Sequence, residues 1–225
     1  MYTNETLSKY IAKAKETEKA LTGKVEKISI SKGNRKIGHT LNVSLPPIIT
    51  CSNCKECKHL CYDIKACMMY KNVIKSRINN LVLLKEDRKA YFDQIRETLK
   101  RRKKNKYFRW HVSGDIIDTD YFENMVQIAK EFPEFRFWTY TKNYYVVNAW
   151  TKTNGKKSIP ENLSIMFSEW RGIPMINPYK FPEFKVVFKD EEKPKKVKWC
   201  CGNCNKCIAK NSHCVKGETV YCMEH

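Results

Sequence analysis

The hydrophobic residues at the start of the chain follow a helical spacing. Residues 4–21 place their apolar side chains on one stripe, at Leu7, Tyr10, Ile11, Ala14 and Leu21. Gly23 follows as a helix terminator. Residues 25–31 and 37–45 instead alternate between apolar and polar positions, and residues 32–35 have the composition of a turn. The pattern predicts one amphipathic helix followed by a β-hairpin.

Residues 66–104 return to helical spacing. Their apolar stripe consists of Met69, Val73, Ile74, Ile78, Leu81, Leu84, Tyr91, Ile95 and Leu99. A break near Glu86 and Asp87 predicts two helices rather than one. From residue 107 onward, short apolar runs alternate with helical segments. Strands are expected at 107–112, 135–141, 163–167 and 184–188, and helices at 119–130 and 143–152.

Strands that alternate with helices indicate βαβ units with parallel strands. The expected fold class is therefore α/β, with a mostly parallel sheet that is open or forms a partial (β/α) barrel. Residues 190–198 are charged and poor in apolar side chains, so we interpret them as a linker. The expected domains are an α/β core at 1–190, with a cysteine-rich loop at 51–67, and a C-terminal cysteine-rich metal-binding module at 191–225.

The net charge bears on partners rather than on the fold. The 225 residues carry a formal charge of +19, which is large for this length. Because such an excess usually accompanies a polyanion, we expect a nucleotide or nucleic acid as partner; the alternative is that the charge serves only solubility. No run approaches the roughly 18 apolar residues of a membrane span, and the N-terminus lacks the build of a signal peptide. We therefore expect a cytoplasmic protein without a membrane partner, whose eleven cysteines are not in disulfides.

The cysteines gather in two matching heptapeptides. Their sequences are Cys51-Ser-Asn-Cys54-Lys-Glu-Cys57 and Cys201-Gly-Asn-Cys204-Asn-Lys-Cys207. Three thiols spaced by two residues on one tight loop are poorly explained by core packing and are typical of metal ligands. Cys61 and Cys67 follow the first set, and Cys200, Cys214 and Cys222 are candidate fourth ligands for the second.

The spacing of the first set favours an iron–sulfur cluster. From Cys51 to Cys61 it reads Cys-x2-Cys-x2-Cys-x3-Cys, which matches the bacterial ferredoxin run except that Tyr62 replaces the usual proline. The last cysteine of that run serves the other cluster in two-cluster ferredoxins, so the fourth ligand stays open. Zinc is the alternative to a [4Fe–4S] cluster. Zinc sites typically draw two ligands from each of two knuckles, so a third close-set cysteine counts against zinc without excluding it.

Polar residues gather where the expected strands end. They are His111, Ser113, Asp115, Tyr140, Lys142 and Glu169. Because the carboxyl ends of parallel strands share one edge of a sheet, these six are candidate catalytic residues at one rim. His111 beside Asp115 is a candidate for general acid–base catalysis or substrate binding. The structural alternative is that strand-to-helix loops are polar in any case and that Asp115 or Ser113 only caps a helix.

Residues 100–106 form the densest basic run, with six basic residues in seven. They are Lys100, Arg101, Arg102, Lys103, Lys104 and Lys106. Such a run is usually a solvated loop, but here it is also the best candidate for contacts with nucleic-acid phosphates. Aromatic residues near the expected rim, such as Trp138 and Trp170, are expected mostly in the core. Any that are exposed beside a basic residue could stack on bases.

The order of these parts resembles the plan of radical S-adenosylmethionine enzymes. That family places a three-cysteine cluster loop after its first barrel strand and a Gly-Gly-Glu-like motif at the end of its second. The loop at 51–61 and the tripeptide Ser113-Gly114-Asp115 occupy these positions. The family hallmark is Cys-x3-Cys-x2-Cys, which Cys57 and Cys61 begin, but position 64 is Ile64. The resemblance makes S-adenosylmethionine a candidate cofactor.

A closer resemblance is to the phage gene product 88 family, a group of phage and mobile-element proteins without an assigned activity. The matching stretches are Leu45-Pro-Pro-Ile-Ile-Thr-Cys51, continuing to Cys61-Tyr62, then Phe108-Arg-Trp-His-Val-Ser-Gly-Asp115, Phe137-Trp-Thr-Tyr-Thr-Lys142 and the distal Cys-Gly-Asn-Cys-x-x-Cys. The resemblance implies a phage-type origin and a cysteine-metal site. It supplies no reaction.

The sequence thus favours a phage-type iron–sulfur enzyme that acts on a nucleotide or nucleic acid at the rim of a parallel sheet. One alternative is a non-catalytic nucleic-acid-binding or regulatory phage protein, in which zinc or iron–sulfur sites hold the fold. The other is an inhibitor of host machinery. The choice between DNA and RNA, and the oligomeric state, stay open.

Overall fold

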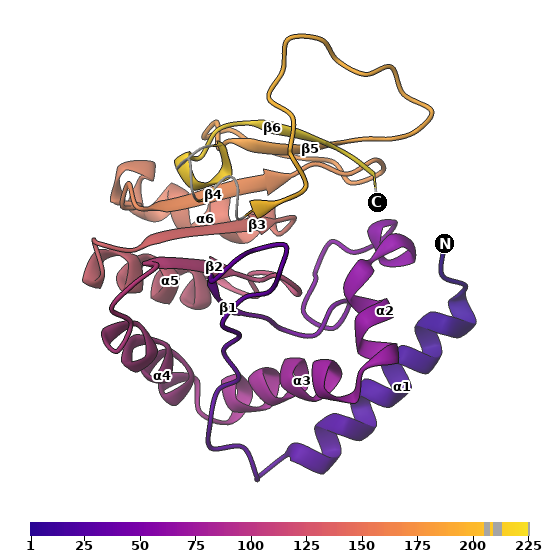
Figure 1. Ribbon diagram of the computed structural model, residues 1–225, viewed down its shortest axis with the longest axis vertical. Helices are drawn as coiled ribbons and strands as arrows, with labels where there is room; N and C mark the ends of the chain where they lie inside the picture. Colours follow the sequence, from indigo (N-terminus) through magenta and orange to yellow (C-terminus); the bar gives the residue numbers. More distant parts are fainter. Residues whose placement is uncertain (205–207, 209–212, 225) are drawn as a thin grey trace.

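The protein is built around one open, parallel β-sheet. The computed structural model describes residues 1–204, 208 and 213–224. Within them the sheet has six strands, which lie side by side in chain order (Figure 1). They are β1 (Leu41–Val43), β2 (Tyr107–Trp110), β3 (Arg136–Thr141), β4 (Leu163–Ser168), β5 (Glu183–Val187) and β6 (Val220–Met223). Every neighbouring pair is parallel, which confirms the expected fold class.

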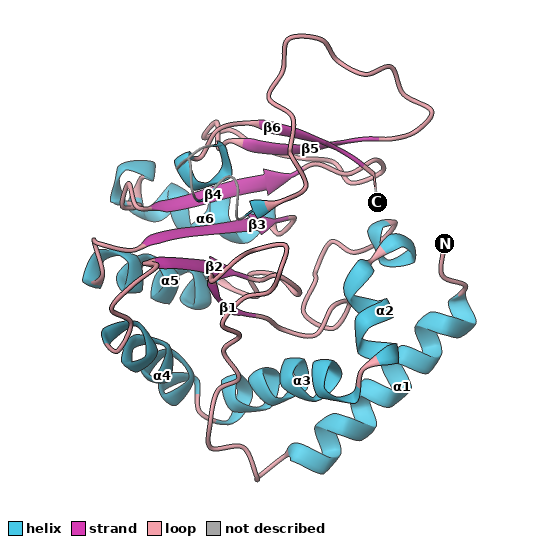
Figure 2. Cartoon of the chain, in the orientation of Figure 1, coloured by secondary structure: helices cyan, strands magenta, loops and turns pink. Residues whose placement is uncertain are grey.

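Helices connect most of the strands (Figure 2). They are α1 (Asn4–Leu21), α2 (Tyr62–Met69), α3 (Lys71–Glu86), α4 (Arg88–Lys100), α5 (Thr119–Glu131) and α6 (Tyr144–Asn154), with short 3₁₀ turns η1 (Cys57–Leu60), η2 (Lys156–Ser158) and η3 (His213–Lys216). Right-handed crossovers between successive strands place their helices on the same face of the sheet. Because the strands follow chain order across the sheet, the opposite face must be covered by other segments.

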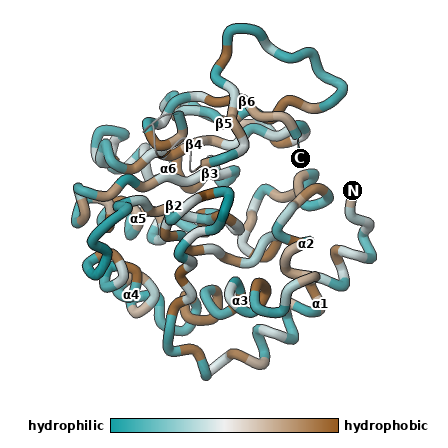
Figure 3. The backbone as a smooth tube through the Cα atoms, in the orientation of Figure 1, coloured by the Kyte–Doolittle hydropathy of each residue, from teal (hydrophilic) through white to brown (hydrophobic). Residues whose placement is uncertain are grey.

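The two faces of the sheet are buried in different ways. On the helix face, Phe108, Phe137 and Phe167 pack with aromatic and aliphatic residues of α4, α5 and α6 into the largest core. On the opposite face, which we call the η3 face, Trp138 and Met166 pack against the C-terminal segment that contains η3. Figure 3 shows hydrophobic stretches along the strands, whereas the loop that directly follows β5 is mostly hydrophilic and projects from the body.

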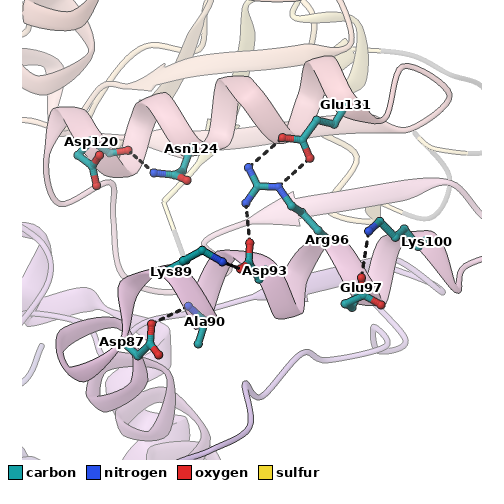
Figure 4. A network of polar contacts seen from close by, with 10 residues as sticks. All are labelled: Asp87, Lys89, Ala90, Asp93, Arg96, Glu97, Lys100, Asp120, Asn124 and Glu131. Carbon is teal, nitrogen blue, oxygen red and sulfur yellow. Dashed lines mark hydrogen bonds and ion pairs between the residues drawn. The ribbon is translucent and has the colours of Figure 1, made fainter.

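Charged residues join the helices that cover the sheet. Figure 4 shows Arg96 of α4 between two acidic partners. Its guanidinium donates to both carboxylate oxygens of Glu131 on α5, at 2.7 and 2.9 Å, and lies 3.6 Å from Asp93. Asp87 caps the start of α4 by accepting a hydrogen bond from the Ala90 N–H at 2.8 Å. This cap explains the helix break that the sequence predicts near residues 86 and 87.

The expected hairpin at 25–45 exists only as two isolated bridges. Ser31 pairs with Asn42, and Asn34 with Gly38. Residues 25–31 are not a strand, because side chains from the helices satisfy their backbone. The Ser29 N–H donates to the Asn80 side chain at 2.7 Å, and the Asn80 amide donates back to the Ser29 carbonyl at 3.0 Å.

Two further features depart from the sequence-based expectations. Tyr70 is not helical and separates α2 from α3, so the region at 66–104, which was expected to hold two helices, contains parts of three. Residues 220–223 form a sixth strand, β6, which pairs with β5 in the main sheet although no strand was expected there. Among the described residues, no helix is both long enough and apolar enough to span a membrane.

Candidate metal centres at the ends of the strands

The first cysteine loop begins directly after β1 and is held against the end of β2. The Leu45 N–H donates to the Ser113 carbonyl at 2.9 Å. Gly114 packs so closely on this segment that a Cβ atom there would lie 2.6 Å from the Leu45 Cβ and 2.7 Å from the Thr50 hydroxyl. Ile48 has a φ of 65°, a left-handed conformation that is rare for a β-branched residue. Together these contacts turn the chain sharply just before Cys51.

A second contact fastens the loop to the end of β3. The side-chain amide of Asn53 donates to the Lys142 carbonyl at 2.6 Å. The loop therefore bridges the carboxyl ends of β1, β2 and β3. This is the edge where the expected rim residues come from, so the structure brings the first cysteine set and part of the rim together.

Cys51, Cys54, Cys57 and Cys61 form what we call the rim cysteines. All four are partly buried. Burial raises the pKa of the Cys57 thiol to about 11, although Lys142 opposes the rise, and the neighbouring Cys61, Cys54 and Asp115 add to it. Burial also raises the pKa of Cys51, and the carboxylate of Asp115 is the next contributor. The thiols thus lie close enough to disfavour one another's ionisation, which a bound cation would reverse.

Asp115 ties the end of β2 to the end of β3. Its carboxylate accepts hydrogen bonds from the Thr141 hydroxyl at 2.6 Å, the Lys142 N–H at 2.9 Å and the Ile116 N–H at 2.7 Å. Burial raises its pKa, and these three donors limit the rise. Ser113 beside it has a buried hydroxyl without a hydrogen-bond partner among the described residues.

His111 is placed differently from the expectation that it works beside Asp115. Its ring nitrogens lie 3.0 Å from the Tyr121 hydroxyl and 3.4 Å from the Thr139 hydroxyl, so its contacts lead toward α5 rather than to the rim. Burial, assisted by the charge of Arg109, lowers the pKa of His111 to about 3. A ring with that pKa stays neutral near pH 7 and is poorly suited to general acid–base catalysis.

Tyr140 points away from the rim cysteines, and Glu169 is held in an ion pair. Successive residues of a strand point to opposite faces, so Tyr140 lies on the η3 face whereas Thr141 reaches Asp115. There the Tyr140 ring meets Phe184 edge-on at 4.9 Å. Glu169 follows β4 and pairs with Lys185 of β5 at 3.4 Å. Of the six residues expected at the rim, Ser113, Asp115 and Lys142 are the ones beside the first cysteine loop.

The C-terminal cysteines lie on the η3 face. Cys200, Cys204 and Cys214 line a small cavity together with Trp138 and Tyr140. Cys222 is buried on β6, and the nearby Cys200 contributes to its raised pKa after burial itself. Cys201 is exposed. Cys207, the third cysteine of the second heptapeptide, lies outside the described residues.

Cys67 has a hydrogen bond of its own. It is buried in the core that α1, α2 and α3 form, and its thiol donates to the Asp63 carboxylate at 3.6 Å. Arg77 also binds this carboxylate, at 3.2 Å. If Cys67 became a metal ligand, its hydrogen bond to Asp63 would break.

Within the described ranges, no three His, Cys, Asp or Glu side chains are already arranged to hold a metal ion, so binding would require the sulfurs to converge.

The basic run at 100–106 lies at the opposite edge of the sheet, because it precedes β2 whereas the cysteine loop follows β1. Lys100 pairs with Glu97 at 3.0 Å, and Lys106 with Glu134 at 3.1 Å. Lys103 and Lys104 are exposed and have no ion-pair partner in the part of the chain that the structure describes. The run is thus a surface feature separate from the rim.

Sequence reasoning missed residues that shape the rim. Asn53 was not among its candidates, and Tyr144 was counted only among the aromatic residues near the expected rim. The Tyr144 hydroxyl donates to the Ser168 carbonyl, and its pKa is raised by burial first and then by Asp115, Glu169 and Cys57. Tyr144 therefore lies among residues of three strand ends. Its position at the start of the helix after β3 was the available signal.

A model of the gene product 88 family matches residues 6–225, nearly the whole chain. The chain belongs to this family. The function of the family is unknown, and the match agrees with the phage-type origin that the resemblance implied. No curated protein and no solved structure matches the chain. The function of this gene product 88 protein must therefore be argued from its own site.

Proposed function

We propose that this gene product 88 protein is an iron–sulfur enzyme that acts on a nucleotide or nucleic acid at the carboxyl ends of β1, β2 and β3. The observation that carries this proposal is the double attachment of the cysteine loop to strand ends. Leu45 attaches it to β2 at 2.9 Å, and Asn53 attaches it to the residue after β3 at 2.6 Å. In open parallel sheets this edge is the usual place for ligands.

The donors at the rim fit a cluster. Cys51, Cys54 and Cys57 supply three thiols from one loop, whereas Cys61 follows at the position whose ferredoxin counterpart serves another cluster. Their mutual proximity and burial favour a positively charged metal centre between them. A [4Fe–4S] cluster held by three cysteines has a fourth iron that is open to a substrate, which is the chemistry it would supply here. Zinc fits the same thiols less well because three of them are so closely spaced.

The protein groups around the loop suit a phosphate-bearing substrate. Lys142 follows β3, and its ammonium lies 5.4 Å from the ring centre of Trp170. A cation and an aromatic ring side by side are the groups that bind a phosphate and stack on a base. Asp115 fixes the Lys142 backbone at 2.9 Å. The Ser113 hydroxyl, which has no partner among the described residues, can donate or accept one further hydrogen bond.

S-adenosylmethionine is the less favoured cofactor. In radical S-adenosylmethionine enzymes the third cysteine of the hallmark would occupy position 64. Here Ile64 is completely buried, in the core formed by α1, α2 and α3. The position therefore serves packing in this chain, and no thiol replaces it.

The proposal is tested with protein purified without oxygen and then reduced. We expect its electron paramagnetic resonance spectrum to change when nucleoside triphosphates or short oligonucleotides are added. Lys142→Met should weaken that response, because it removes the cation beside Trp170 while keeping the backbone contact to Asp115. Lys152→Met, at an exposed position on α6, is the matched control. A spectrum that none of these ligands changes would remove nucleotides from the proposal, and a response to S-adenosylmethionine alone would favour that cofactor instead.

The second candidate is a non-catalytic nucleic-acid-binding protein. The exposed Lys103 and Lys104, at the edge of the sheet opposite to the rim, favour it, because their charge is not neutralised by any carboxylate among the described residues. In that case the metal centres would only hold the fold.

A further inference from the structure

The C-terminal cysteines are arranged differently from what their sequence motif indicates. A small, partly open cavity of about 20 Å³ on the η3 face is lined by Trp138, Tyr140, Cys200, Asn203, Cys204, Ile208, Cys214 and Val215. Three of these residues carry thiols, and they come from two separate segments of the chain. The heptapeptide instead aligns Cys201 with Cys51, yet Cys201 is exposed and does not line the cavity.

Backbone hydrogen bonds decide which of the two adjacent cysteines faces inward. The Cys200 N–H donates to the Tyr221 carbonyl at 2.7 Å, and the Tyr221 N–H donates to the Lys198 carbonyl at 2.8 Å. This pairing sets residues 198–200 beside β6, which carries Cys222. The Gly202 N–H points back at the Cys200 sulfur at 3.4 Å, whereas the Cys201 thiol donates to the Asn203 carbonyl at 3.2 Å. The Cys200 sulfur thus accepts a hydrogen bond, whereas the Cys201 thiol donates one.

Arg109 supplies an independent observation. Its guanidinium lies on the η3 face, 4.9 Å from the centre of the Tyr140 ring. Its Nε is buried without a hydrogen-bond partner among the described residues, and no carboxylate pairs with it there. Arg88, by comparison, has such a partner in Asp118 at 2.6 Å. Burial lowers the pKa of Arg109, yet the nearby Tyr140 and the thiols of Cys204 and Cys214 raise it above its ordinary value.

A cation whose Nε is buried without a partner needs a negative neighbour. Four thiolates around one divalent metal ion carry a net charge of about −2, and would supply that neighbour where the described residues place no carboxylate. The cavity is small, and its space of about 20 Å³ is enough for one particle the size of a water molecule, which a single metal ion does not exceed.

We propose that Cys200, Cys204, Cys214 and Cys222 bind a single zinc-type metal ion on the η3 face, with Arg109 as its neighbouring cation. Cys200, Cys204 and Cys214 line the cavity, and Cys222, on the strand beside Cys200, supplies the fourth ligand that a tetrahedral site requires. The site is separate from the rim cysteines. It therefore does not depend on the proposed iron–sulfur enzyme and stands if that proposal fails.

Adjacent cysteines provide a matched pair of variants for the test. Full-length protein is purified, its folding is checked by circular dichroism, and its zinc, iron and sulfide contents are measured. We expect Cys200→Ser, Cys204→Ser, Cys214→Ser and Cys222→Ser each to lose one zinc per chain, with the iron and sulfide of the rim unchanged. Cys201→Ser should retain the wild-type zinc content. Loss of zinc in Cys201→Ser but not in Cys200→Ser would overturn the assignment, and so would an unchanged zinc content in every variant.

A measurement on the wild-type chain covers variants that fail to fold. Alkylation followed by mass spectrometry should modify Cys201 in the native protein and leave Cys200, Cys204, Cys214 and Cys222 protected until a chelator is added. Equal reaction of Cys200 and Cys201 before chelation would contradict the site. Arg109→Gln retains all four ligands, and we expect it to weaken zinc affinity about 10–100-fold, as changes beside a metal's ligands typically do.

Discussion

His111 shows how a polar residue near a site can serve the fold. Its backbone is left-handed, with a φ of 53°. Its ring contacts Tyr121 of α5, whose hydroxyl lies 3.0 Å from that of Tyr91 on α4. A chain of polar contacts thus runs from the end of β2 through two helices. Since all three rings are buried, their polar atoms depend on one another rather than on water.

This environment predicts a pH dependence of stability. The pKa of His111 is lowered to about 3 in the folded protein, against about 6.5 when unfolded. The contribution of neutral His111 to the free energy of unfolding is therefore complete above about pH 6.5. It is lost as the pH falls toward 3, because the unfolded chain binds a proton at this histidine more readily than the folded chain does. Between pH 7 and pH 5 we expect the wild type to lose about 2 kcal/mol from this residue.

Urea unfolding at both pH values measures this loss. His111→Asn is the informative variant, because asparagine tolerates a left-handed backbone and does not titrate. We expect the variant to be less stable at pH 7 but to lose about 2 kcal/mol less than the wild type on acidification. Equal losses in the two proteins would show that His111 is not kept neutral by its surroundings.

At the scale of elements, the account depends on close packing between the end of β2 and the cysteine loop. Gly114 and Gly155 have nearly the same left-handed φ, 80° and 78°. A Cβ atom at Gly114 would collide with Leu45 and Thr50, whereas a Cβ at Gly155 would meet nothing within 4 Å. The two positions therefore separate backbone strain from packing against the loop.

Alanine at these two glycines gives a direct comparison. Gly155→Ala should cost about 1–3 kcal/mol, because its φ of 78° and ψ of 144° lie in a region that alanine rarely adopts. Gly114→Ala should cost about 1–3 kcal/mol more, because Leu45 and Thr50 must move. It should also lower the iron content, since those residues lead into Cys51. Thermal unfolding and iron analysis test both effects, and similar results for the two variants would mean that the loop does not rest on β2.

The elements themselves were largely predictable, and the contacts between them were not. Period and turn residues located α1, α5 and β2 to β5 within a few residues. These local signals did not predict that the Asn80 side chain would bind the Ser29 backbone in place of a neighbouring strand. That hydrogen bond joins residues 51 positions apart in the sequence. The same holds for the candidate site. The motif containing His111 and Asp115 was recognisable, but strand alternation and the packing of α5 send the two side chains to different partners.

At the scale of the whole molecule, the basic run and the two cysteine sets occupy different regions. The rim cysteines lie at the carboxyl edge of the sheet, the C-terminal cysteines lie on its η3 face, and the basic run lies at its amino edge. The repeated heptapeptide did not predict that the two cysteine sets would be placed differently. Backbone hydrogen bonds between residues 198–200 and β6 place Cys200, rather than Cys201, in the lining of the cavity. Equal spacing in the sequence thus leads to unequal sites.

The basic run predicts a salt-dependent affinity for nucleic acid. If Lys103 and Lys104 contact phosphates of a duplex, replacing both by glutamine should reduce the slope of log affinity against log salt by about 2. Lys15 and Lys19 are exposed on α1 and serve as the control pair, for which we expect no change in slope. Fluorescence anisotropy with labelled oligonucleotides measures the slopes. An unchanged slope in the Lys103 and Lys104 variant would exclude this run as a binding surface.

The iron and acid-labile sulfide contents of protein purified without oxygen decide whether the rim cysteines hold a cluster. We expect a coloured protein with iron and sulfide in equal amounts, about four of each per chain. Serine at Cys51, Cys54 and Cys57 should abolish both, whereas Cys67→Ser should retain them, because the Cys67 thiol donates to Asp63. A colourless wild-type protein that contains zinc but no sulfide would contradict this expectation.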